Sequence, residues 1–222
     1  MAGTALAWDT SGNKKFEVGV KKCALYVWDS TNSSYSNGVA WNGITGITIS
    51  NTGGEETALW ADDIKYASMR SAEECGGTIE AYQCPVEFYP CDGITEITTG
   101  TYAAQQKRLP FGLAFVTTIG NDTSGTSYGY KIHLLYNCTA SPSERPYTTI
   151  NESPDAATFS WEFKSNPVTL TGFEQTAHIE IDSTTANATK LAAFEAILFG
   201  SNSADATLPS PDQVKSYLTP GT

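Results

Sequence analysis

Two histidines, His133 and His178, are the candidates for a general base in any hydrolytic site that this chain could build. A Ser/His/Asp arrangement needs that base beside a nucleophile, which many hydrolases present on a strained Gly-x-Ser-x-Gly turn. Neither histidine lies near such a turn, and each falls where apolar and polar residues alternate. The sequence therefore favours two ordinary strand residues over a catalytic triad.

Acidic residues stand in three adjacent pairs: Glu55–Glu56, Asp62–Asp63 and Glu73–Glu74. Paired carboxylates can supply the acid and base of a glycoside hydrolase or the oxygen ligands of calcium. Neighbouring residues on a strand point to opposite faces, however, and the chain has neither a D-x-D-x-D-G calcium loop nor a Gly-Lys-Ser/Thr phosphate loop. A solvated acidic face is the simpler interpretation. A glycoside hydrolase, with two carboxylates about 5 to 10 Å apart in a cleft, is kept as an alternative.

The five cysteines do not have the spacing of a zinc site, which usually contains close C-x(2-4)-C pairs. They are Cys23, Cys75, Cys84, Cys91 and Cys138. An odd number in a chain long enough to form a core also argues against a disulfide framework. We expect reduced thiols that pack as small apolar side chains, and no metal or cofactor.

The formal net charge of -11 makes stable binding to a nucleic-acid backbone unfavourable. Most of this charge lies in residues 55–96, which hold ten acids against two bases. The chain does not open with a basic segment followed by an apolar run, and no stretch approaches the ~20 apolar residues of a membrane span. We expect a soluble protein that is made in a cytoplasm and binds no membrane.

The elements that must position these residues are mostly strands, because apolar and polar residues alternate in many segments. In residues 159–164, for example, Phe159, Trp161 and Phe163 face one way and the polar residues between them face the other. Similar patterns or β-branched and aromatic runs occupy residues 16–20, 23–28, 44–50, 77–84, 111–118, 128–137 and 178–182. The sequence predicts a mainly β (α+β) fold, a sandwich or barrel with one flanking helix and long loops.

Helical signals occur in three places. Leu191, Phe194 and Leu198 recur at helical spacing within residues 189–199, before Gly200. Ser71 and Glu74 have capping-box spacing, and Ser210 precedes Pro211 as a helix cap would. We predict a covering helix at 189–199 and short helices at the other two sites.

We expect one domain over residues 1–222, with a flexible N-terminal arm at 1–14 and a C-terminal segment at 205–222. No linker or internal repeat divides the chain. Residues 51–76 and 118–129 are the predicted long loops, and they are the candidates for ordering on assembly.

Several segments together form a recognisable series over roughly residues 15–215. The most specific are the Trp41-Asn42-Gly43 turn in GVAWNGITGITIS, the strand EAYQCPVEF and the segment SWEFKSNPV, followed by LPSPDQV near the C-terminus. In this series the chain resembles the major tail proteins of long-tailed, non-contractile bacteriophages of the siphophage type, especially those of Gram-positive hosts.

The resemblance implies a non-enzymatic structural subunit of the virion tail, assembled in the cytoplasm of the bacterial host. Such subunits form rings, expected to contain six copies each, that stack head to tail into a tube through which DNA is ejected. The implied partners are further copies of the chain, the tape measure protein, the tail terminator and the distal tail or baseplate proteins. Genomic DNA would be a partner only in transit.

Two sets of residues are candidates for this role. A lumen wall that attracted phosphates would stall DNA, so acids are expected to line it. Only acids within about a Debye length of the DNA, ~8 Å, can repel its phosphates. The candidate lumen acids are Glu55, Glu56, Asp62, Asp63, Glu80 and Glu96. The candidate contacts between subunits are Lys14, Lys15, Lys21, Lys22, Trp41 and Trp60. The lysines could also simply protect a strand edge from pairing.

A monomeric carbohydrate-binding β-sandwich is the alternative from another functional class. It would use exposed aromatic side chains, for which Trp28, Trp41, Trp60 and Tyr82 are the candidates. Such residues also occur in cores and at contacts between subunits.

Overall fold

The computed structural model describes residues 5–147, 149 and 156–219. Its fold is mainly β, with antiparallel sheets and flanking helices, which confirms the predicted fold class. Six strands form a helix-covered sheet: β1 (Lys15–Asp29), β2 (Ser34–Tyr35), β3 (Val39–Ala40), β10 (Phe111–Asn121), β11 (Gly125–Ala140) and β13 (His178–Asp182). Three strands form a second layer, the three-stranded sheet: β4 (Ile44–Gly53), β7 (Glu73–Ala81) and β12 (Phe159–Ser165).

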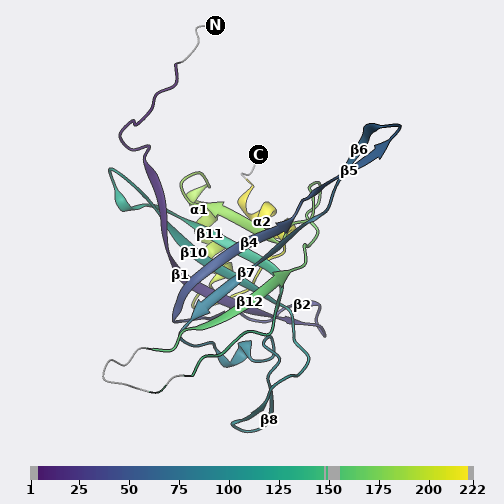
Figure 1. Ribbon diagram of the computed structural model, residues 1–222. Helices are drawn as coiled ribbons and strands as arrows, with labels where there is room; N and C mark the ends of the chain where they lie inside the picture. Colours follow the sequence, from purple (N-terminus) through teal and green to yellow (C-terminus); the bar gives the residue numbers. More distant parts are fainter. Residues whose placement is uncertain (1–4, 148, 150–155, 220–222) are drawn as a thin grey trace.

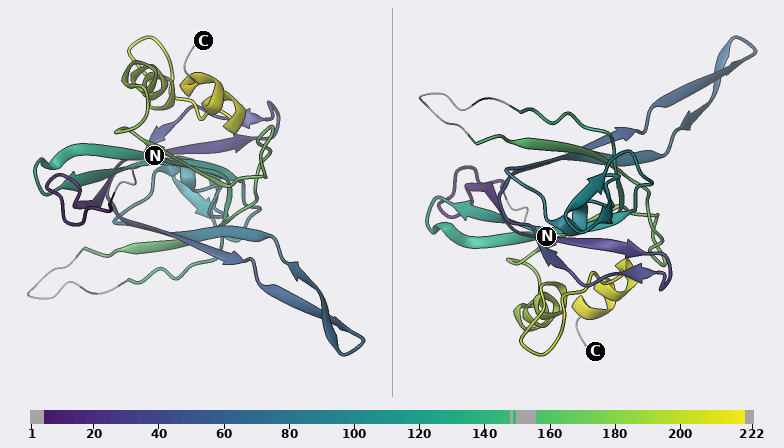
Figure 2. Two further views of the ribbon diagram at one scale, coloured as in Figure 1. Left: turned by 90° about the horizontal axis from the view of Figure 1, so that it is seen from above. Right: turned by 90° about the horizontal axis from the view of Figure 1, so that it is seen from below.

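The two sheets are hydrogen-bonded to one another through the end of β11. Residues 131–135 of β11 pair with β13, whereas residues 138–140 pair with β12. Between these stretches Asn137 has a φ of 48°, and the register of β10 against β11 shifts there. This bulge lets one long strand pass from one layer to the other. Figures 1 and 2 show the resulting layers, with the helices on one side and the three-stranded sheet on the other.

Alternation along the strands of the helix-covered sheet explains why both of its faces are buried. Leu25, with Cys23, joins the core between the sheets, whereas Ala24 and Tyr26 face the helices. The core between the sheets is rich in aromatic rings, and Phe88 contacts both Trp41 and Trp161 there. Phe88 belongs to a short 3-10 helix, η1 (Val86–Phe88).

Two helices cover the outer face of the helix-covered sheet. They are α1 (Ala188–Leu198) and α2 (Pro211–Leu218). In α1 the residues predicted to face the sheet, Leu191, Phe194 and Leu198, are buried. α2 begins with a capping box in which Ser210 and Gln213 bond each other's backbone. Both helix predictions are confirmed. Within the described residues, neither helix is long and apolar enough to cross a bilayer.

The helix predicted from Ser71 and Glu74 is wrong, because Glu73–Ala81 is strand β7. The capping spacing is a local signal, whereas β7 obtains its backbone hydrogen bonds from both β4 and β12. The 118–129 loop is also a misprediction: it is the tip of the β10–β11 hairpin, where Asn121 Oδ1 accepts from the Ser124 N–H at 2.6 Å.

The predicted loop at 51–76 consists of strand ends and a further hairpin, β5 (Glu56–Ala61) and β6 (Ile64–Arg70). A second small hairpin, β8 (Thr95–Thr98) and β9 (Thr101–Ala103), lies at the opposite end of the molecule (Figure 1).

Of the predicted N-terminal arm, residues 1–4 lie outside the described part of the chain. Residues 5–14 form no strand, but Gly12 is held at the β10–β11 turn. Its N–H donates to Asp122 Oδ1 at 2.9 Å, and its carbonyl accepts from Asn121 Nδ2 at 3.1 Å. The predicted C-terminal segment contains α2, and its residues 220–222 are outside the described range.

Candidate functional site

The β5–β6 hairpin projects away from the two sheets (Figures 1 and 2). Its turn is formed by Asp62 and Asp63, whose φ angles are 51° and 62°. Positive φ at both central residues is the signature of a type I′ turn, and Asp tolerates this conformation better than most residues. The adjacent acids, for which the sequence favours a solvated acidic face over a calcium or catalytic pair, form this turn.

Large apolar side chains are exposed along this hairpin. Trp60 is 69% exposed and Tyr66 is 73% exposed, and Leu59, Ile64 and Met69 are also exposed. An isolated two-stranded hairpin is at best marginally stable in water, and contiguous exposed apolar surface often marks an interaction site. The predicted contact residue Trp60 is therefore accessible, and the hairpin presents further apolar residues that the sequence interpretation missed. Apolar and aromatic residues on both sides of the Asp62-Asp63 turn were the signal that could have revealed them.

Polar and charged groups of the hairpin bond across its two strands. Lys65 Nζ lies 2.5 Å from Glu56 Oε1, and the Ser68 hydroxyl also donates to this carboxylate. These bonds, led by the one from Lys65, lower the pKa of Glu56. The Glu55 side chain is exposed, and its carbonyl accepts from the Ser71 N–H at 3.2 Å.

The six candidate lumen acids do not form one patch on the subunit. Four of them, Glu55, Glu56, Asp62 and Asp63, lie at the base or the tip of the projecting hairpin. Glu80 is exposed on β7, and Glu96 is on β8 at the opposite end of the molecule (Figure 1). If the acids line a common wall, copies of the chain must bring them together.

The outer face of the three-stranded sheet is a polar surface that includes Glu80. Ile79 and Ala81 of β7 are buried between the sheets, so Glu80 between them faces outward, as does Glu162 of β12. Glu74 lies on the same strand as Glu80 and is 3.7 Å from Lys164 Nζ. β4 is the last strand in the order of pairing, so it forms an edge of the three-stranded sheet.

The four candidate lysines lie on or just before β1, but in two different settings. Lys14 is 3.8 Å from Asp9, and the Lys15 ammonium lies over the Tyr128 ring. Lys21 and Lys22 lie at an irregular stretch of β1, and Lys22 Nζ is 5.8 Å from the centre of the Phe199 ring. The lysines therefore do not form a single cluster.

Trp41 was predicted as a contact between subunits, and the structure argues against this role. Its side chain is 2% exposed and packs against Phe88 and Trp161 in the core between the sheets. Its indole N–H donates to the Gln83 carbonyl at 2.9 Å. The Trp-Asn-Gly turn therefore contributes a core residue to the fold, and no surface ring.

The aromatic residues proposed for carbohydrate binding lie on separate elements. Trp28 packs edge-on against Tyr35 at the end of β1, and Trp60 is on the projecting hairpin. Tyr82 is exposed just after β7. With Trp41 buried, these rings do not form a common platform for a sugar.

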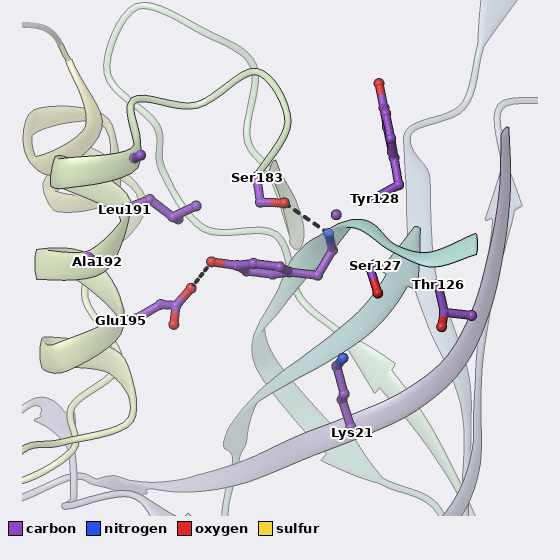
Figure 3. A pocket seen from close by; sticks show the side chains of 11 residues that line it. Lys21, Thr126, Ser127, Tyr128, Ser183, Leu191, Ala192 and Glu195 are labelled. Carbon is purple, nitrogen blue, oxygen red and sulfur yellow. Dashed lines mark hydrogen bonds between the residues drawn. The ribbon is translucent and has the colours of Figure 1, made fainter. Parts of the chain in front are cut away.

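A hollow of about 480 Å³ lies between α1 and the first residues of β11, next to the tip of the β10–β11 hairpin (Figure 3). Figure 3 shows Glu195 of α1 and Ser183 on its two sides, both hydrogen-bonded to Tyr130. Burial, together with the bond to Glu195, raises the pKa of Tyr130 to about 12. Glu195 is the one carboxylate among the lining residues, so the hollow does not supply the acid pair of a glycoside hydrolase.

His133 and His178 are strand residues, as the alternation predicted, but the structure also brings them into contact. Their rings stack with centroids 5.4 Å apart, and His133 Nδ1 is 3.2 Å from His178 Nε2. The sequence interpretation treated each histidine separately and did not anticipate the pair. Pairing of β11 with β13 creates the contact.

Asp92 was counted among the acids of residues 55–96, but its side chain is 7% exposed. Arg145 pairs with its carboxylate, and Arg108 lies 3.7 Å from it. The Trp161 indole N–H donates to Oδ2 at 3.1 Å. This acid therefore belongs to the interior and adds nothing to an acidic surface.

Comparison of the sequence with models of protein families and with curated proteins finds no match.

Proposed function

We propose that this chain is a structural subunit that polymerises into stacked rings and forms the tail tube of a long-tailed bacteriophage. The observation that carries the proposal is the projecting β5–β6 hairpin, whose exposed apolar residues include Trp60, Ile64 and Tyr66. Residues of this type on a thin projection need another surface to cover them. A second copy of the same chain would provide it.

A contact of this kind leads naturally to a filament. The hairpin extends from one side of the molecule (Figure 2), and in the proposed assembly it covers a different surface on the next copy, not a second hairpin. Such an interface joins two different patches, so each added copy leaves a free hairpin or a free receiving surface at the ends. Repetition of the contact gives a ring where the rotation closes and an open stack where it does not.

Strand edges support lateral contacts within a ring. β4 ends the order of paired strands, and its Ile44–Gly53 backbone can bond a strand of a neighbouring copy. Joining sheets in this way removes exposed edges, which otherwise invite uncontrolled aggregation.

The outer face of the three-stranded sheet suits the wall of a DNA channel. Glu80 and Glu162 project from it, and the outward-facing positions of β7 and β12 carry no aromatic side chain. Repulsion between such carboxylates and phosphates would keep DNA from adhering during transit. Of the candidate lumen acids, Glu80 is therefore the one that the sheet geometry favours.

In this role the protein is not an enzyme and its function depends on its surfaces. It would act in the virion tail after assembly in the bacterial cytoplasm. Further copies, the tape measure protein, the tail terminator and the distal tail or baseplate proteins would be its partners. DNA would meet it only in passage.

Electron microscopy of the concentrated protein, with sedimentation analysis, tests the proposal. We expect rings or tubes about 10 nm wide, a width that follows from the size of a 222-residue domain. The double variant Trp60→Ser/Tyr66→Ser should fold normally but sediment as a monomer. Phe173→Ser, which changes a ring that is 66% exposed and lies beside Lys215 of α2, should assemble like the wild type.

Two results would count against the proposal. Wild-type protein that stays monomeric at all concentrations and binds glycans would favour the carbohydrate-binding alternative. Normal tubes from the double variant would show that the hairpin is not the contact, which would remove the main support.

A further inference from the structure

Three potential metal ligands converge on the face of the helix-covered sheet that is turned away from the helices. His133 of β11 is directly opposite Glu180 of β13, and His178 is two residues before Glu180 on the same strand. Directly paired residues, and residues two apart on a strand, point to the same face. One ligand atom from each of the three side chains lies within 4.8 Å of the other two.

His133 is held rigidly in this cluster. Its ring stacks on Phe115 with centroids 4.6 Å apart, and its side chain is 7% exposed. Its Nε2 lies 3.0 Å from Thr117 Oγ1 and 3.4 Å from Glu17 Oε1. Because the Thr117 hydroxyl donates its own proton to Glu17, it accepts from His133 Nε2–H. In the neutral ring the lone pair is therefore on Nδ1.

That lone pair faces the other two ligands. His133 Nδ1 is 3.2 Å from His178 Nε2 and 3.8 Å from Glu180 Oε1. Two nitrogen ligands of a tetrahedral zinc ion, each ~2.0 to 2.1 Å from the metal, are about 3.3 Å apart. The same separation fits a hydrogen bond from His178 Nε2–H, so a cation would take the place of that single proton.

The surroundings of the cluster suit a divalent cation. A neutral imidazole ligates such an ion through a lone pair, and the bond between His133 Nε2 and Thr117 leaves the lone pair of Nδ1 free for this purpose. Lys131 lies 2.9 Å from Glu17 and 3.3 Å from Glu180, so one ammonium offsets one of the two carboxylates. The group as a whole carries a net negative charge.

We propose that His133, His178 and Glu180 form a binding site for a divalent transition-metal ion of the zinc type. Two imidazoles and one carboxylate are the ligands that such ions prefer, whereas magnesium and calcium prefer oxygen alone. Glu17 and Thr117 orient His133 through its second ring nitrogen, as the partners of metal-bound histidines commonly do. Glu180, whose side chain is 48% exposed, leaves the ion one side open to water. The site is independent of the polymerisation proposed above.

Calorimetric titration of the untagged 222-residue chain with Zn²⁺, after a chelator has removed bound metal, tests this site. We expect one equivalent to bind, and Mg²⁺ at the same concentration to give no heat. His178→Gln and Glu180→Gln should each weaken binding at least tenfold, and Glu17→Gln should weaken it by about tenfold. Glu162→Gln, an exposed acid on the other sheet, is the matched control and should bind like the wild type.

Because the chain has two histidines, Co²⁺ absorption and histidine side-chain NMR report on this site without overlap from other imidazoles. Both histidine resonances should shift together as metal is added. Circular dichroism shows whether each variant is folded. Zinc binding that persists unchanged in His133→Gln/His178→Gln would overturn the proposal. A thiolate–cobalt band in the Co²⁺ spectrum, or the absence of metal binding to folded wild-type protein, would also overturn it.

Discussion

The Tyr35 hydroxyl accepts a hydrogen bond of 2.9 Å from the backbone N–H of Asn137, the residue at which β11 leaves one sheet and joins the other. The Asn137 carbonyl accepts from the Asn166 N–H at 3.1 Å, so the bulge is bonded on both sides. Its φ of 48° is left-handed, a conformation that Asn and Gly tolerate and other residues adopt only at a cost.

We therefore expect Asn137→Ala to lower the free energy of unfolding by about 1 kcal/mol or more, the cost of a left-handed conformation for an ordinary residue. Asn137→Gly should be close to neutral, because glycine adopts the same φ without strain. Urea denaturation of the monomer gives both values. Equal destabilisation by the two substitutions would mean that the lost side chain matters and the backbone conformation does not.

A second prediction concerns Asp92, which is buried with Arg145, Arg108 and the Trp161 indole N–H around it. Asp92→Asn keeps the shape but leaves the arginines without their counter-charge. Removal of one partner from a buried ion pair typically costs ~3 to 5 kcal/mol. Thermal and urea unfolding should show a loss of this order. Glu87→Gln, which changes an exposed acid five residues earlier, should stay within about 0.5 kcal/mol of the wild type.

A pH dependence follows from Asp212 in the first turn of α2. Its carboxylate accepts from the Thr171 backbone N–H and from the Thr171 hydroxyl, both at 2.8 Å. These bonds, led by the backbone one, lower the pKa of Asp212 in the folded protein. The stability that they provide is present above the unfolded pKa, ~3.9, and is lost as the pH falls through the lower folded value.

Asp212→Asn should accordingly be less stable than the wild type at pH 7, and the difference should shrink as the pH falls below about 4. Melting temperatures of both proteins across this range measure it. Glu174→Gln, in the loop that leads to β13, is the control and should show no comparable change. A difference between Asp212→Asn and wild type that is constant with pH would exclude the charge as its cause.

The five thiols should react slowly in the folded protein, because all are free and four of them are buried. Burial raises the pKa of Cys84 to about 11 and that of Cys91 to about 12, and it raises the pKa of Cys23, Cys75 and Cys138 as well. At pH 8 roughly one Cys84 in a thousand is then a thiolate, the reactive form.

A thiol-reactive chromophore should modify Cys84 first, since it is the one partly exposed thiol, and all five should react rapidly after unfolding in denaturant. Cys84→Ser should remove the earliest phase. Rapid modification of several thiols in the native protein would contradict the packing described for the core.

The sequence by itself determined many of the strands, the two helices and the general charge of this protein. Period-two alternation identified residues 159–164 and 178–182, and the Ser210 cap identified α2, because each signal lies within a few neighbouring residues. The excess of acids is a matter of composition. The resemblance to tail tube proteins also came from the sequence, and the proposed function still depends on it together with the exposed hairpin.

Only the tertiary structure decided which strands pair and which side chains are covered. His133 and His178 are 45 residues apart, and the antiparallel register of β11 and β13 places their nitrogens 3.2 Å from each other. Trp41 and Asp92 looked like surface residues in the sequence, but they are buried because distant aromatic and arginine side chains enclose them. Local periodicity specifies the face of a strand on which a residue lies, whereas its neighbours across the sheet and in the core come from remote parts of the chain.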